Sequence, residues 1–102
     1  MGNNIKTWEE AWDDLDAAYA MPCKTTEEAK KRGNAEDSAT GEIIKLIVND
    51  FDGKINAKQA RIIWKLAYEQ GHAYGCRDIA FHLETLMDTF RDFVAEGEKA
   101  EA

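Results

Sequence analysis

The strongest helical pattern of this chain lies in "AKQARIIWKLAYEQGHAYGCRDIAFHLETLMDTFRDFV", residues 57–94. Its apolar residues recur every three or four positions, which is the spacing of one face of an α-helix. The spacing continues almost unbroken across Gly71 and Gly75. Two alternatives therefore stay open: one long helix, or two helices joined by a bend at "GHAYG". The apolar positions are Ile62, Ile63, Leu66, Ala67, Tyr74, Ile79, Leu83, Leu86, Met87, Phe90 and Val94.

The two glycines of "GHAYG" are also candidate packing residues. Gly71 and Gly75 lie four positions apart, so on a helix they would share one face. Without side chains, that face would let the backbone of a neighbouring helix approach closely. Trp64 falls on the opposite side from the apolar face of this segment, and we expect it to be exposed.

The first 22 residues predict a separate amphipathic helix. "TWEE", residues 7–10, is a capping box in which Thr7 and Glu10 satisfy each other's backbone amides. Pro22 ends the helix, because the residue before a proline disfavours helical torsions. We interpret the aromatic stripe of this helix as core rather than as a ligand site; its members are Trp8, Trp12, Leu15 and Tyr19.

Between these two regions the signals are weaker. "TTEEAKKRG", residues 25–33, predicts a short helix that opens at Thr25 and closes at Gly33. "NAEDSATG", residues 34–41, is expected to be a loop, and "GEIIKLIVNDF", residues 41–51, a further helix. Residues 23–40 are accordingly a candidate mobile connection. Asn56 is expected to cap the helix that begins at Ala57.

Together these segments predict an all-α protein, a small bundle of three to four helices with a long C-terminal helix or helix pair. We expect one domain over residues 1–96 and a frayed tail over residues 97–102. Apolar residues make up 44% of the 102 residues, enough for one modest core. No apolar run approaches the roughly 20 residues of a membrane span. Two cysteines do not make a disulfide framework, and we expect a cytoplasmic protein with reduced thiols.

"NDFDGKINAKQ", residues 49–59, resembles the middle of a calcium-binding EF-hand loop. Placing Gly53 at the sixth loop position puts Val48 at the first and Gln59 at the twelfth. Calcium requires an oxygen ligand at the first position and a bidentate carboxylate at the twelfth. The loop lacks both, so we predict a plain connection in which Gly53 takes a positive φ angle.

Zinc, catalytic and DNA-binding interpretations are weaker still. His72 and Cys76 lie four apart, but the chain has neither CxxC nor HExxH spacing. No oxyanion loop or phosphate-binding glycine motif accompanies Cys76 as a nucleophile, so we expect no enzyme, no metal and no cofactor. Residues 55–83 also resemble a DNA-binding helix-turn-helix. A recognition helix over residues 78–92 would, however, present acids that DNA repels.

Acidic residues gather at both ends of the chain. Residues 1–22 carry five acids and one base, residues 78–102 carry seven acids and two bases, and residues 23–77 carry ten bases and eight acids. In the last segment, acids recur every four positions, which places them about 6 Å apart along a nearly straight stripe. The candidate partner-binding residues are Glu84, Asp88, Asp92 and Glu96, with Glu9, Asp13 and Asp14 on the first helix.

Two interpretations of these acids compete. One is a solvated face that keeps a small protein soluble. The other is a row of carboxylates that imitates a nucleic-acid backbone and binds a basic groove on a partner protein. This second interpretation is the one we carry forward, with a protein that has a basic groove as partner and no direct binding of nucleic acid or membrane.

The pattern "AYE", one residue, "GH" and a later glycine, in residues 67–75, resembles a segment of small bacteriophage proteins. The resemblance covers about a quarter of the chain. It implies a phage origin, a host bacterial cytoplasm as the location, and an inhibitor of a nucleic-acid-handling or defence protein. Two alternatives remain: a structural or regulatory protein that self-associates around Gly71 and Gly75, and a small transcription regulator.

Overall fold

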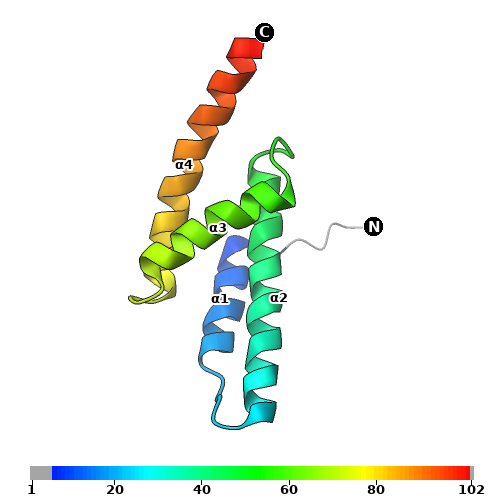
Figure 1. Ribbon diagram of the computed structural model, residues 1–102, viewed down its shortest axis with the longest axis vertical. Helices are drawn as coiled ribbons and strands as arrows, with labels where there is room; N and C mark the ends of the chain where they lie inside the picture. The colour runs from blue at the N-terminus through cyan, green and yellow to red at the C-terminus, as the bar shows by residue number, and fades with distance from the viewer. Residues whose placement is uncertain (1–5, 102) are drawn as a thin grey trace. The chain divides into compact units, whose positions relative to one another are not determined.

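The computed structural model describes the backbone of residues 6–101 and the side chains of residues 6–97. Four helices follow one another along the chain: α1 (Trp8–Tyr19), α2 (Thr26–Asp50), α3 (Ala57–Gly71) and α4 (Cys76–Glu101). Figure 1 shows them in this order. No strand occurs within residues 6–101. The all-α prediction, with a C-terminal helix pair, is confirmed.

The chain divides into two compact units, Met1–Leu46 and Ile47–Ala102. The first contains α1 and most of α2. The second contains the last turn of α2, the connection that follows it, and the α3–α4 pair, whose two helices contact each other. α4 continues through part of the segment expected to be a frayed tail, and its last residue is Glu101; Ala102 lies outside the described residues.

The N-terminal caps agree with the sequence. The hydroxyl of Thr7 accepts from the amide of Glu10 at 3.2 Å, and the Thr7 amide donates to the Glu10 carboxylate at 2.9 Å. The amide-to-carboxylate bond is the main reason that the pKa of Glu10 is lowered. Thr25 and Glu28 make the same reciprocal pair at 3.1 Å in each direction. Asn56 caps α3, as predicted.

The predicted loop over residues 34–41 is wrong. α2 is one helix of 25 residues, and neither Gly33 nor Gly41 ends it. A glycine inside a helix costs about 1 kcal/mol relative to alanine, which the helix-forming residues on both sides can outweigh. Arg32 and Glu36 add an i,i+4 ion pair at 3.0 Å across the site of the expected break.

α2 ends at Asp50, within the segment 49–59 that resembles the middle of an EF-hand loop. The amide of Gly53 donates to the carbonyl of Val48 at 3.1 Å, and the amide of Asp52 to that of Asn49 at 3.0 Å. This pairing is a Schellman motif, which requires left-handed backbone after the helix. Asp52 has φ 54° and Gly53 has φ 74°, so the positive φ predicted for Gly53 is confirmed.

"GHAYG" forms a turn, which decides between the two alternatives left open by the sequence. α3 ends at Gly71 and α4 begins at Cys76, with Gly75 at φ 117° between them. Gly71 is buried, and a Cβ atom built on it would lie 2.5 Å from the backbone nitrogen of Ile79. The start of α4 therefore lies directly against the end of α3. Around Gly75 there is open space, so its role is in the turn.

The exposure predicted for Trp64 is wrong, because only 7% of this residue is accessible. The buried face of α3 is rotated from the expected one and leaves Ile62 and Leu66 exposed. Tyr74, expected on the apolar face, is 78% exposed in the turn. Five of the predicted positions are buried: Ile63 and Ala67 on α3, and Ile79, Leu83 and Met87 on α4. Ala60 and Trp64 of α3 are buried as well, in place of Ile62 and Leu66.

In the first unit, the buried positions of α1 are Ala11, Leu15 and Ala18. Trp8 and Trp12 are half-buried and stack with ring centroids 6.2 Å apart. The aromatic stripe thus contributes Leu15 to the core, while its aromatic rings lie at the edge of the core.

Candidate functional site

The acidic series of α4 is exposed to solvent. We define it as Glu84, Asp88, Asp92 and Glu96, and all four residues are exposed. Among the described residues, Glu84, Asp92 and Glu96 take part in no ion pair. Like charges four positions apart destabilise a helix by a few tenths of a kcal/mol per pair, so the series does not help α4 to form.

The acidic series winds around α4, which corrects the straight stripe expected from the sequence. Four residues turn an α-helix by about 40° more than one full turn. Three such steps carry the series about 120° around the helix. By this count Glu84 lies on the side opposite Phe93, and Glu96 lies close beside Phe93. The two ends of the series therefore face different surroundings.

Arg91 compensates part of the charge in the middle of the series. Its guanidinium donates to the Asp88 carboxylate at 2.7 Å and lies 4.0 Å from the carboxylate of Asp50. It also covers the ring of Phe51, with its central carbon 5.5 Å from the ring centroid. Arg91 thus links α4 to the end of α2 within the second unit, and Asp88 is the most compensated member of the series.

The acids of α1 belong to the first unit. Glu9 and Asp13 are exposed, whereas Asp14 is half-buried. The Lys6 ammonium donates to the Asp14 carboxylate at 2.6 Å and lies 3.0 Å from the Glu42 carboxylate of α2. The hydrogen bond from Lys6 is the main reason that the pKa of Asp14 is lowered, and the same bond raises the pKa of Lys6. Asp14 thus has a structural partner, which the sequence pattern did not indicate.

The Lys6–Asp14 pair should give the first unit a specific acid sensitivity. Because the pKa of Asp14 is lower in the folded protein, the ionised carboxylate stabilises the fold at pH values above its ordinary pKa of 3.8. This stabilisation is lost as the pH falls through the lowered pKa. We expect Asp14→Asn to lower the melting temperature near neutral pH, and the difference from the unmodified protein to shrink towards about pH 2. Thermal unfolding monitored by circular dichroism between neutral pH and about pH 2 measures this difference in melting temperature. Asp13→Asn, at an exposed neighbour, is the control, and parallel curves for Asp14→Asn and the unmodified protein would contradict the assignment.

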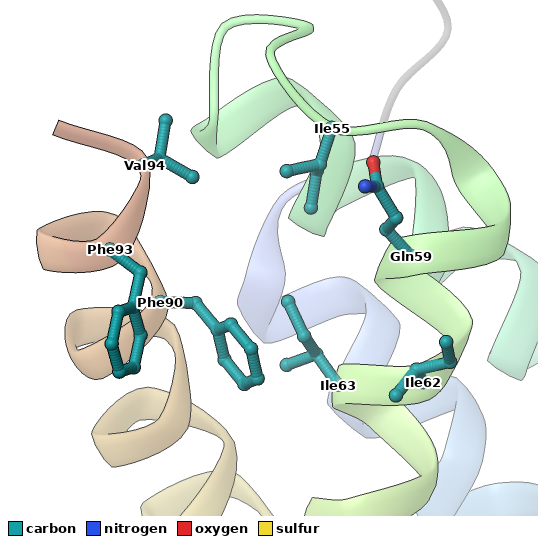
Figure 2. A pocket seen from close by; sticks show the side chains of 7 residues that line it. All are labelled: Ile55, Gln59, Ile62, Ile63, Phe90, Phe93 and Val94. Carbon is teal, nitrogen blue, oxygen red and sulfur yellow. The ribbon is translucent and has the colours of Figure 1, made fainter. Parts of the chain in front are cut away.

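An apolar groove in the second unit was not predicted from the sequence. Figure 2 shows its walls: side chains from the residues before α3 and from α3 face side chains of α4 across an open space. Its volume is about 260 Å³, which is below the size of usual small-molecule sites. Its lining residues are Ile55, Gln59, Ile62 and Ile63 on one wall and Phe90, Phe93 and Val94 on the other. The only available signal was the surplus of apolar residues in α3 and α4, more than one core-facing stripe needs.

His72, which was considered for a zinc site, makes local contacts, and so does the free cysteine Cys23. The His72 ring stacks on Tyr68 with centroids 5.1 Å apart, and its Nδ1 lies 3.0 Å from the Tyr68 carbonyl oxygen. Cys23 is exposed, with its sulfur 3.2 Å from the Arg32 guanidinium. Within the part of the chain that the structure describes, no three His, Cys, Asp or Glu residues are grouped as a metal site would need.

Comparison of the chain with protein-family models, with curated proteins and with solved structures gives no match. The resemblance of residues 67–75 to bacteriophage proteins therefore stays a prediction. Over the described residues, no helix has both the length and the apolar character that a membrane crossing demands.

Proposed function

We propose that this chain is a non-catalytic binding protein whose acidic series on α4 docks on a basic surface of another protein. The observation that carries the proposal is the exposure of four acids on one helix, three of them without an ion pair among the described residues. Such a surface is costly for the helix itself, and a basic partner would turn that cost into attraction.

The winding of the series favours a curved partner surface. Carboxylates that rise about 6 Å and turn about 40° at each step follow a helical path. A basic groove that normally holds a nucleic-acid backbone is also shaped around a helical row of negative charges. We therefore propose DNA mimicry as the form of binding, with a host nucleic-acid-handling or defence protein as the target of a phage inhibitor.

The test compares two variants that remove the same number of charges. The first neutralises the acidic series, with Glu84→Gln, Asp88→Asn, Asp92→Asn and Glu96→Gln. The second neutralises four exposed acids elsewhere and controls for net charge; its changes are Glu27→Gln, Asp37→Asn, Asp52→Asn and Glu69→Gln. Tagged forms of both and of the unmodified protein are used to capture partners from bacterial lysate, followed by washes of rising salt.

We expect the unmodified protein and the control variant to retain the same nucleic-acid-handling or defence protein and to release it as salt rises. The variant of the acidic series should retain none of it while keeping its helical circular dichroism spectrum. Equal capture by all three proteins would contradict the proposal, since position in the series would then have no effect. A partner lost by both variants would assign binding to net charge rather than to α4.

A further inference from the structure

The apolar groove of the second unit has exposed apolar side chains on both walls. Ile62 on α3 is 53% exposed and Phe93 on α4 is 64% exposed. Figure 2 shows both among the side chains that border the groove. Covering these two side chains removes apolar surface from water, which is favourable. The groove is therefore a place where association would be favourable.

The two walls carry opposite charges beyond their apolar edges. On α3, the exposed bases Lys58, Arg61 and Lys65 recur every three or four residues and lie beyond Ile62, counted around the helix from the groove. On α4, the exposed acids Asp92 and Glu96 lie beyond Phe93. α3 and α4 run in opposite directions along the groove. Moving around each helix away from the groove, past Ile62 on α3 and past Phe93 on α4, therefore leads across the same face of the helix pair. That face thus has a basic side, an apolar centre and an acidic side.

A surface with this order of charges is complementary to itself. Rotation by 180° about an axis along the groove exchanges its basic and acidic sides and keeps every residue at its level. Gln59 and Ile62 of α3 line the same groove as Phe90, Phe93 and Val94 of α4. Lys58 and Arg61 are neighbours of the first pair in sequence, and Asp92 and Glu96 are neighbours of the second group. The bases of one copy therefore meet the acids of the other at the same level.

We propose that this face binds a second copy of the chain, with α3 of each copy against α4 of the other. Ile62 and Phe93 form the apolar centre, and Lys58 and Arg61 of one copy pair with Asp92 and Glu96 of the other. A partner with a uniformly basic or acidic surface would be repelled by one of the two walls. The opposite charges of the walls thus favour a second copy over such a partner.

The dimer uses only one end of the acidic series. Glu84 lies on the opposite side of α4 from Phe93 and Asp88 lies between the two directions, so neither belongs to the dimer face. This separation leaves Glu84 and Asp88 to the proposed target binding alone, whereas Asp92 and Glu96 take part in both contacts. It also gives the dimer an internal control, because acids of the same helix can be changed inside and outside the face.

The test exchanges charges across the proposed contact. One variant carries Lys58→Glu and Arg61→Glu, and the other carries Asp92→Lys and Glu96→Lys. The mass of each full-length protein is measured by sedimentation equilibrium over about a hundredfold range of concentration, alone and in an equal mixture. A third variant, Glu84→Lys with Asp88→Lys, changes the net charge as much as the second but lies outside the face. Circular dichroism checks that all of them remain helical.

We expect the unmodified protein and the third variant to shift from one copy to two as concentration rises. Each of the first two variants should stay at the mass of one copy, because both of its contacts set like charges against each other. Their mixture should form a dimer with one copy of each, since both contacts are then complementary again. A single-copy mass for the unmodified protein, a dimer of either exchanged variant alone, or no dimer in the mixture would overturn the proposal. Loss of the dimer in the third variant would overturn it as well.

Discussion

Gly71→Ala is expected to lower the free energy of unfolding by about 2–3 kcal/mol. The added Cβ would lie 2.5 Å from the backbone nitrogen of Ile79 and 2.7 Å from the carbonyl carbon of Asp78. Both contacts are with backbone, so no side chain can move aside and α4 has to shift away from α3. Thermal unfolding should show a melting temperature lower by on the order of 10 °C.

The control for this change is Gly33→Ala. Gly33 lies inside α2, and a Cβ atom built on it has no atom within 4 Å. Alanine is the better helix former there, so the same chemical change should raise stability by about 0.5–1 kcal/mol. Opposite signs at the two glycines are the expected result. Equal and small effects at both would show that α3 and α4 do not meet at Gly71.

Trp64→Ala is expected to have the largest effect of any single truncation, about 3–5 kcal/mol. Trp64 is 7% exposed, so its removal leaves a cavity and loses a large buried apolar surface. Had this side chain been exposed, as the sequence suggested, the loss would be about 0.5 kcal/mol or less. Urea unfolding followed by far-ultraviolet circular dichroism measures the difference.

Phe81→Ala provides the matched aromatic control, because Phe81 on α4 is 64% exposed. Its truncation should cost less than about 1 kcal/mol. A loss for Trp64→Ala as small as that for Phe81→Ala would contradict the rotated core face of α3.

The helix starts and their caps could be predicted from the sequence because those signals are local, whereas the loop expected inside α2 was wrong. The reciprocal bonds of Thr7 with Glu10 and of Thr25 with Glu28 depend on residues three positions apart, and both form. Periodicity likewise predicted α3 and α4. It could not determine whether the chain turns at "GHAYG", since a four-residue turn preserves nearly the same spacing on both sides.

What the sequence could not provide depends on contacts between distant residues. The face of α3 that is buried depends on where α4 approaches, and Gly71 sets that approach. A wheel that places Ile62 and Leu66 inside is as apolar as one that places Trp64 and Ala60 inside, so composition alone could not choose between them. The ion pair of Asp14 could not be predicted from the sequence either. Its Lys6 partner is shared with Glu42, which lies 28 positions away from Asp14 in the chain.

The acidic series depends both on local sequence spacing and on contacts between distant residues. Its residues were identified from spacing, and the structure places all four at the surface. Its winding separates an end near the apolar groove from an end opposite it, and this separation has meaning only once the groove is known. Function at the two ends can therefore be tested separately.

The most direct measurement is the affinity of the captured partner for the double variant Glu84→Gln with Asp88→Asn, by titration calorimetry. These acids lie outside the proposed dimer face, so self-association should be unchanged. We predict a loss of affinity of about tenfold or more relative to the unmodified protein, and a weaker dependence on salt. Unchanged affinity and unchanged salt dependence would contradict the claim that α4 binds its target through the acidic series.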